Sequence, residues 1–375
     1  MANHSDDDLV LIEAVRRYCS EVLAPAAAEI DETGRSATCH LDSLAKMGLM
    51  GLNIPEAYGG LGLRATALFD AVALIAGACG STSSMITAHW LATDSILYGG
   101  DEPQRHRYLI GAAGKSLGAF ALTEPGAGSN PTDMTTRAVR EGDGYRITGT
   151  KHFISNAGEA DFIVVYAKTD ASAGARGISA FVVDPRAGGV RIGAPERTMG
   201  LRGGHVFEVS LDCTVPEENR LGSEGSGFRT ALKVLDGGRV EIAACAVGIA
   251  EAAFAAATEW AKQRNVGGAP IASFQGLQWM LADMATDIEA SRLLGMAAAR
   301  KREAGERYSR ESSMAKLFAS EMVGRVTDKA IQIHGGYGYT RDLPLERYSR
   351  DARIFRIYEG SSEIQRNIIA RAVLA

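Results

Sequence analysis

Near the end of the chain, one carboxylate has a setting that could perform proton chemistry. Glu359 lies between Tyr358 and Gly360, and the apolar Ile354 and Phe355 come just before them. A carboxylate among apolar neighbours is poorly solvated, so its pKa rises and it becomes a stronger base towards weak acids. The alternative is that Glu359 is a solvated loop residue, because a Tyr-Glu-Gly sequence alone does not distinguish the two.

Two stretches in the middle of the chain could hold a ligand. Residues 121–130 read Ala-Leu-Thr-Glu-Pro-Gly-Ala-Gly-Ser-Asn, a glycine-rich turn whose backbone N–H groups could bind a phosphate, with Ser129 adding a hydroxyl. A plain connecting loop is the alternative. Phe153 and Ser155 are two residues apart, so in a strand they lie on one face, where they could cover a flat ring and bond its edge. A core phenylalanine in an edge strand is the alternative.

A third stretch, residues 332–339, ends a long helix with three glycines. One glycine would suffice for a helix C-cap, so three indicate that a bulky group approaches the backbone. His334 beside them is interpreted as a packed or capping histidine. No second His or Cys follows at metal-ligand spacing, so we predict no metal site.

The bulk properties narrow the class of protein. The 375 residues carry a net charge of −5, and 46% are hydrophobic, which is typical of a soluble globular chain of two or three domains. Without a basic stripe, nucleic acid is not an expected partner. The five cysteines show no CxxC spacing, which favours a reducing, cytoplasmic setting. We find no secretion signal and no apolar run of about 18 residues, so no membrane association is expected.

Hydrophobic periodicity divides the chain into three parts and predicts an α+β, mostly α fold. We expect an N-terminal helical domain over residues 1–118, interrupted at Pro25, a middle β domain over residues 119–225 with a hairpin at residues 141–144, and a C-terminal helical bundle over residues 226–375. The helices expected with the clearest periodicity are 41–47, 65–77, 84–98, 239–263, 274–303 and 312–333. No strand-GxGxxG-helix unit occurs, which excludes a nicotinamide-type dinucleotide fold.

Together these stretches resemble the acyl-CoA dehydrogenase family of flavoenzymes, from about residue 6 to residue 375. The family's C-terminal signature is matched at Gln332, Gly335, Gly336, Gly338, Asp342, Arg347 and Asp351. The resemblance implies FAD as the cofactor and α,β-dehydrogenation of an acyl-CoA thioester. A carboxylate removes the α-proton, the β-hydrogen leaves as hydride to flavin N5, and electrons then pass to an electron-transferring flavoprotein.

The resemblance also implies a role for each matched position. Glu359 would be the base, and its backbone N–H, with a ribityl hydroxyl of FAD, would bind the thioester oxygen. The implied FAD-binding residues are Phe120, Leu122, Thr123, Ser129, Phe153, Ser155, Arg264, Gln275, Gln332, Gly336, Ser361 and Glu363. The implied substrate-binding residues are Ser129, Asp236, Arg239 and Gly360. In the family, the positions of Arg264, Gln275, Gln332 and Gly336 reach the FAD of a neighbouring subunit, which implies a homo-oligomer, usually a tetramer.

The sequence departs from the family pattern at two places. Asn130 follows Ser129 where relatives have Asp, which keeps an acceptor and loses a charge. Residues 267–269 are Gly-Gly-Ala where relatives have Phe-Gly-Lys, so we expect FAD to dissociate more readily than is usual. Trp90 and Tyr98 lie on the helix that borders the acyl tail in relatives. They would shorten the pocket and favour short or branched acyl groups, unless both are ordinary core residues.

Other functions remain open from the sequence. A relative with altered chemistry, such as an acyl-CoA oxidase, a flavin monooxygenase or a desulfinase, is the first alternative; retention of Glu359 favours dehydrogenation over the last two. A non-catalytic FAD-binding scaffold is the second. The sequence does not distinguish a CoA thioester from a carrier-protein thioester, or one acyl length from another.

Overall fold

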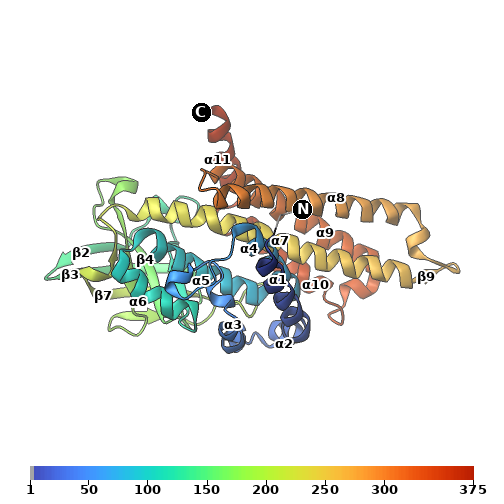
Figure 1. Cartoon of the computed structure of the whole chain (residues 1–375), viewed down its shortest axis with the longest axis horizontal. Helices are drawn as coiled ribbons and strands as arrows, with labels where there is room; N and C mark the ends of the chain where they lie inside the picture. Colours follow the sequence, from blue (N-terminus) through green and yellow to red (C-terminus); the bar gives the residue numbers. More distant parts are fainter. Residues whose placement is uncertain (1–3) are drawn as a thin grey trace.

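The computed structural model describes residues 4–375, and it places a β-sheet between two groups of helices along the chain (Figure 1). The N-terminal helices are α1 (Asp6–Tyr18), α2 (Ala24–Thr33), α3 (Leu41–Lys46), α4 (Ala65–Ala78), α5 (Gly80–Gly99) and α6 (Glu102–Ala113). The strands between them and the next helices are β1 (Gly118–Ala121), β2 (Arg137–Glu141), β3 (Gly144–Ser155), β4 (Phe162–Lys168), β5 (Ile178–Val183), β6 (Val190–Ile192), β7 (Val206–Pro216) and β8 (Arg220–Leu221). The C-terminal helices are α7 (Gly227–Gln263), α8 (Gln275–Glu303), α9 (Ser309–His334), α10 (Leu345–Ala352) and α11 (Ser362–Leu374). The predicted α+β, mostly helical architecture is confirmed.

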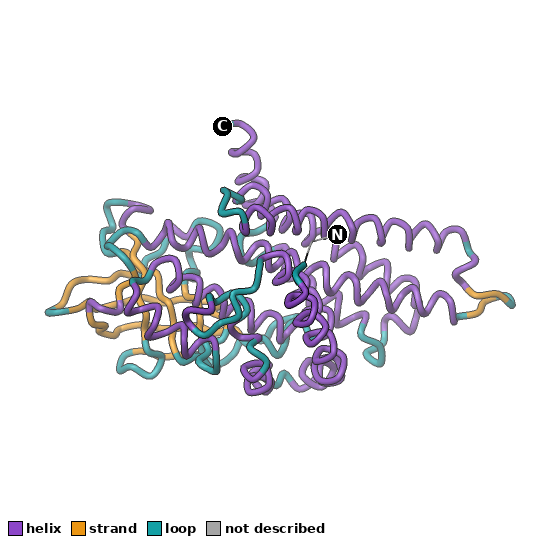
Figure 2. Tube along the Cα trace, in the orientation of Figure 1, coloured by secondary structure: helices purple, strands orange, loops and turns teal. Residues whose placement is uncertain are grey.

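Strands β1 to β8 form one mixed sheet at one end of an elongated molecule, and the long helices extend to the other end, where a separate two-stranded hairpin lies (Figure 2). The strand order of the mixed sheet is β6-β7-β3-β2-β4-β5-β8, and β1 pairs with β4 in parallel. The predicted hairpin is present: Glu141 pairs with Gly144, and Gly142 takes the left-handed conformation with φ 58°. β1 runs directly into the glycine-rich turn, so the sheet brings that turn to the edge of the helical layer.

Strand β3 is irregular where it carries Phe153. Its pairing with β7 shifts register between Lys151 and Ile154, and Phe153 has φ 57°. A bulge re-aims the side chain that it carries, and the ring of Phe153 is 62% exposed. The bulge interrupts the two-residue period of the strand, and Phe153 and Ser155 nevertheless line one cavity.

The 37-residue helix α7 is the centre of the helical layer, and it packs against α4, α5, α8 and α9. A β-carbon on Gly77 of α4 would lie 2.8 Å from the carbonyl oxygen of Gly248, so these two helices approach at backbone distance. Among residues 4–375, α7 is the one helix long and apolar enough to cross a membrane, but 72% of its apolar window is buried inside the protein. Its hydrophobicity is thus accounted for by helix packing.

The chain near Pro25 differs from the expectation. Pro25 does not interrupt the helical path; it lies in the first turn of α2, directly after a π-helical segment, Cys19–Leu23, that follows α1. Proline is tolerated in a first helical turn because its missing N–H would have no intrahelical partner there.

Candidate active site

A cavity of about 550 Å³ lies between α5, α7, the end of β1, the end of β3 and the loop before α11. Its lining includes nine of the residues singled out from the sequence: Phe120, Leu122, Thr123, Ser129, Phe153, Ser155, Arg239, Glu359 and Gly360. Segments more than 200 residues apart in the chain therefore meet in one place.

Glu359 is the ionisable group at the centre of this cavity. Its Oε2 atom is buried and has no hydrogen-bond partner among residues 4–375. A β-carbon on Gly238 of α7 would collide with this oxygen and would lie 2.8 Å from Cδ2 of Leu91 on α5. The carboxylate therefore fits between α5 and α7 only because residue 238 lacks a side chain.

The backbone at Glu359 is held in an uncommon conformation. Glu359 has φ 53°, in the left-handed region that non-glycine residues rarely adopt. Two buried side chains fix this peptide: Lys316 Nζ donates to the Gly360 carbonyl at 2.7 Å, and Gln365 Nε2 donates to the carbonyls of Glu359 and Gly360 at 3.2 and 2.9 Å. Lys316 and Gln365 were missed by sequence reasoning, because a lysine on α9 gives no local sign that it contacts this loop.

The surroundings of Glu359 favour its protonated form. Burial raises the pKa of Glu359 to about 8, and the nearby carboxylate of Glu241 adds to the rise, while Lys316 and Arg239 oppose it. Arg239 donates to Asp236 at 2.6 Å, and its Nε has no partner within the described part of the chain. The cavity thus contains a basic carboxylate and a partly unpaired guanidinium, which is a pattern typical of catalytic sites.

The opposite side of the cavity is formed by β-sheet residues and the bulge in β3. The exposed ring of Phe153 stacks on His152, with centroids 4.2 Å apart and planes 17° from parallel. The backbone N–H of His152 donates to the Thr123 carbonyl at 3.0 Å, which ties the bulge to the start of the glycine-rich turn. Phe120 packs on Tyr166, with ring centroids at 5.2 Å. An exposed aromatic ring beside Thr123 is suited to cover a planar ligand.

Glu124 fixes the glycine-rich turn through hydrogen bonds to the following chain and to β3. Its carboxylate accepts hydrogen bonds from the backbone N–H groups of Thr135 and Thr136 at 2.6 and 3.0 Å, and from Lys151 Nζ at 2.9 Å. Burial acts to raise the pKa of Glu124, but Lys151 and these donors lower it to about 2. Glu124 is therefore a structural anion that holds the turn, whose Gly126 has no described atom near its missing side chain.

Several residues singled out from the sequence lie elsewhere. Asp236 holds Arg239 and also accepts from Ser309. Ser361 is the N-cap residue of α11, and its side chain bonds Glu363, which is fully exposed. In the described structure, Asp236, Ser361, Glu363, Gln275 and Gln332 lie outside the lining of both pockets.

The two aromatic residues expected to shorten the acyl pocket do not face the cavity. Trp90 is fully buried and donates through its indole Nε1 to the Met50 carbonyl at 2.8 Å, on the side of α5 turned away from the site. The Lys233 ammonium lies 4.0 Å from the centre of the Tyr98 ring. The interpretation of both as pocket-shortening residues is wrong, because α5 presents Ser84, Thr87, Ala88 and Leu91 to the cavity instead.

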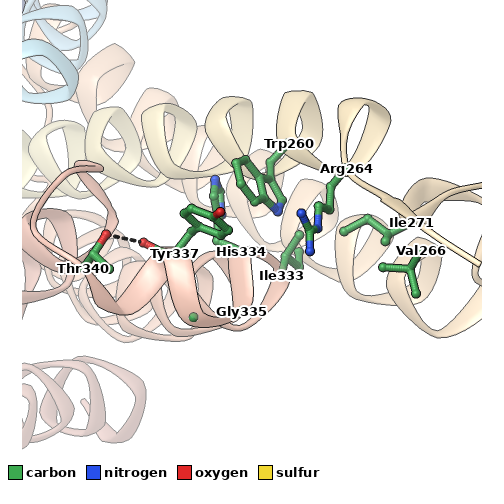
Figure 3. Close-up of a pocket in the computed structure, with 10 residues that line it drawn as sticks. Trp260, Arg264, Val266, Ile271, Ile333, His334, Gly335, Tyr337 and Thr340 are labelled. Atoms are coloured by element: carbon green, nitrogen blue, oxygen red, sulfur yellow. Dashed lines mark hydrogen bonds between the residues drawn. The ribbon is translucent and has the colours of Figure 1, made fainter.

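A second pocket, of about 430 Å³, lies at the far ends of α7 and α9 and contains Arg264 and Gly336 (Figure 3). There Trp260 stacks on His334 at 5.0 Å, and Arg264 lies 5.9 Å from the centre of the Tyr337 ring. His334 also bonds the Ala330 carbonyl, so it is a packed histidine. From Arg239 to Arg264 the helix rises about 38 Å at 1.5 Å per residue, so the two pockets are separate.

The departure at residues 267–269 has a local structural cause. Gly267 and Gly268 form the two-residue turn between β9 (Asn265–Val266) and β10 (Ala269–Pro270), with φ values of 61° and 85°. Positive φ at both central residues is the requirement of a type I′ hairpin turn, which glycine meets without strain. The rim of the second pocket therefore has a tight turn without side chains, next to Val266 and Ile271, which line this pocket.

The Gly267-Gly268 turn agrees with the prediction that FAD dissociates readily from this protein. A glycine offers no surface to a bound ring, so we expect the protein to lose FAD during extended dialysis. The measurement is the ratio of flavin to protein absorbance before and after dialysis, with reconstitution by added FAD as the control. A stoichiometric yellow holoprotein that survives dialysis would count against the expectation.

Comparison with known proteins identifies the family. Residues 5–115, 119–214 and 225–374 match, in this order, the acyl-CoA dehydrogenase N-terminal domain, middle domain and C-terminal domain. The chain belongs to the acyl-CoA dehydrogenase family. It is accordingly an FAD-dependent oxidoreductase that acts on acyl-CoA, as the sequence resemblance predicted.

Similar proteins align over nearly their whole length. The chain is 43% identical to the short-chain specific acyl-CoA dehydrogenase of Clostridium acetobutylicum, over 96% of this chain and 95% of that protein. It matches the structure of butyryl-CoA dehydrogenase from Megasphaera elsdenii with a TM-score of 0.97 at 38% identity, covering both chains fully. A chain in a structure of the electron transferring flavoprotein of Acidaminococcus fermentans also matches, with a TM-score of 0.97, 42% identity, and coverage of 100% and 99% of the two chains.

The residues of this acyl-CoA dehydrogenase family member fit a flavin. The cavity joins the exposed Phe153 ring and the hydroxyl-bearing Thr123 and Ser155 to the unpaired Glu359 oxygen. A planar ring beside Phe153 would cover apolar surface, and the hydroxyls could bond its polar edge. The open glycine-rich turn with Ser129 could hold the diphosphate.

Proposed function

We propose that this protein catalyses α,β-dehydrogenation of a short- or branched-chain acyl-CoA thioester, with Glu359 as the base that removes the α-proton. The observation that carries the proposal is the Oε2 atom of Glu359: buried, unpaired among residues 4–375, and placed in a cavity with Thr123 and Ser155. A structural glutamate would be expected to have a partner for a buried oxygen.

The chemistry asked of the chain is removal of a very weakly acidic proton. The raised pKa of Glu359, about 8, makes its carboxylate a stronger base than an exposed one. A hydrogen bond from the Glu359 backbone N–H to the thioester oxygen would stabilise the charge that develops as the proton leaves. Lys316 and Gln365 hold this peptide in place before substrate arrives. Bound FAD supplies the hydride acceptor.

The acyl preference rests on the similar proteins and on one contact. Two relatives are described as short-chain specific and as butyryl-CoA dehydrogenase. In this chain, the apolar side chain of Leu91 lies against Gly238 and lines the cavity together with Glu359. These observations support a small acyl group; Trp90 and Tyr98 carry no part of the argument.

Partners and location follow as part of the proposal. The match to a chain in an electron transferring flavoprotein structure supports such a flavoprotein as electron acceptor. The second pocket, with Arg264 and Gly336 remote from the cavity, supports a homo-oligomer, with a tetramer as the expected state, in which these residues contact a neighbour's FAD. We place the protein in the cytoplasm, a reducing setting that the five cysteines without CxxC spacing favour.

An anaerobic screen tests the proposal. FAD-loaded protein is mixed with acyl-CoAs of increasing length and branching, and loss of oxidised-flavin absorbance is followed. Fastest bleaching by short or branched acyl-CoAs is expected, whereas a preference for long chains would overturn the acyl assignment. Absence of bleaching by any acyl-CoA would overturn the reaction. Hydrogen peroxide formed at the dehydrogenation rate in air would indicate an oxidase.

A further inference from the structure

Helix α7 has no side chains at two consecutive positions beside the Glu359 carboxylate. Gly237 and Gly238 are consecutive, and each is approached by a charged side chain. Glu359 contacts the Gly238 side, while a β-carbon on Gly237 would lie 3.3 Å from Nη1 of Arg302, a residue of α8. Because neither glycine has a side chain, the helix backbone is the main barrier between Glu359 and the charges around Arg302.

Arg302 belongs to a buried cluster with more negative than positive groups. Its Nη1 donates to Glu241 at 3.2 Å and its Nη2 to Asp94 at 3.4 Å, and both carboxylates are nearly inaccessible to solvent. Asn53 donates to Asp94 at 2.9 Å. One guanidinium therefore serves two carboxylates, and each contact is longer than an ideal charged hydrogen bond. Burial raises the pKa of Asp94, and it raises the pKa of Glu241 to about 7.

Glu241 is the member of this cluster that faces the base. It lies three residues after Gly238 on α7, on the same side of the helix. The other titratable groups facing Glu359 are Lys316 from α9, Arg239 and Cys245 from α7, and Tyr358 from its own loop. The positive charges of Lys316 and Arg239 favour the ionised form of Glu359, whereas the negative charge of Glu241 disfavours it.

We propose that Glu241, held by Arg302 one turn along α7 from Gly238, is a positioning residue that sets the protonation state of Glu359 through space. The inference rests on the proposed role of Glu359 as base. Arg302 fixes the Glu241 carboxylate by a hydrogen bond, and the missing side chain at Gly238 lets Glu359 lie directly against the same face of α7.

The sign of the effect follows from the charges. Ionised Glu241 disfavours a second negative charge on Glu359, so it keeps the base protonated to higher pH. The rate of flavin reduction by the wild-type protein should rise with pH, with a midpoint near pH 8, as Glu359 loses its proton. In Glu241→Gln the midpoint of this pH profile should fall by about one pH unit. At pH 7 this shift increases the ionised fraction of Glu359 about fivefold.

The test compares Glu241→Gln with a matched control on the same helix. Gln keeps an oxygen that can accept from Arg302 and removes one buried negative charge, so folding should be preserved. Glu251→Gln removes a carboxylate that pairs with Arg292 farther along α7 and should leave the profile unchanged. The first readout is the pH dependence of the second-order rate constant for anaerobic flavin reduction, which reports the free enzyme.

A second readout does not depend on turnover. Infrared difference spectra of the protein, with the Glu359 carboxyl band assigned by its loss in Glu359→Gln, give the titration midpoint of Glu359 directly. A downward shift in Glu241→Gln but not in Glu251→Gln supports the proposal, and an unchanged midpoint overturns it. If Glu241→Gln does not fold, Glu241→Asp should give a smaller shift in the same direction. If no acyl-CoA reduces the flavin, the proposed function fails while the infrared result still decides the inference.

Discussion

Glu359→Gln is expected to slow the reduction of bound flavin by acyl-CoA by about 10²–10⁴-fold, the range typical of a lost general base. The amide has the size of the carboxylate and fits beside Gly238, so the fold, the cavity and the left-handed backbone should be retained. What is lost is the lone acceptor for the α-proton. The measurement is single-turnover flavin reduction without oxygen, at a pH above 8 where wild-type Glu359 is ionised.

Two observations accompany this comparison. Flavin content and melting temperature should match those of the wild type, which shows that the loss lies in the chemical step. Binding of an acyl-CoA, seen as a perturbation of the flavin spectrum, should persist because the cavity walls are unchanged. Reduction by Glu359→Gln at close to the wild-type rate would assign the base to another residue.

Gly238→Ala is expected to lower the same rate constant by about 10²-fold, although residue 238 has no side chain of its own. The added methyl group would occupy the place of Glu359 Oε2 and press on Leu91. The carboxylate is the movable partner, so it would be displaced by about 1 Å, and a displacement of that size is enough for such a loss. The effect should appear in the rate of reduction more than in acyl-CoA affinity.

The matched control is Gly276→Ala on α8, where no described atom lies within 4 Å of the added methyl group. Alanine favours a helix interior over glycine by about 1 kcal/mol, and because Gly276 lies in the first turn of α8 the control gains no more than Gly238→Ala in intrinsic helix propensity. Only Gly238→Ala should lose activity. Equal activities of the two variants would show that Glu359 does not depend on the space at Gly238.

The layout of the fold could be predicted from sequence because its signals are local. Three long helices, a run of short β-branched strands and a turn at residues 141–144 each carry their own periodicity or turn residues. The apolar setting of Glu359 and the glycine-rich turn were visible in the sequence, but the grouping of Thr123 with Glu359 in one site came from a resemblance, since no spacing in the chain links positions so far apart.

What the sequence did not reveal depends on tertiary contacts. The sequence offered Trp90 as a pocket residue because its helix borders the acyl tail in relatives. A helix has two faces, however, and the indole N–H of Trp90 donates to the Met50 carbonyl on the face of α5 turned away from the cavity. The bulge at Phe153 depends on a register shift against β7, which no residue of β3 announces. No local pattern distinguishes Gly238 and Glu241 from other positions of α7. Their importance depends on tertiary contacts with the loop of Glu359 and with the guanidinium of Arg302.

The left-handed backbone of Glu359 has an evolutionary consequence. A glutamate at φ 53° carries a conformational cost of about 1–3 kcal/mol that glycine or asparagine would largely avoid. Selection retains such a residue only while its side chain is needed. A descendant of this protein that no longer performs the reaction would gain stability by replacing it, so the residue type at this position serves as a marker that separates working lineages from decayed ones.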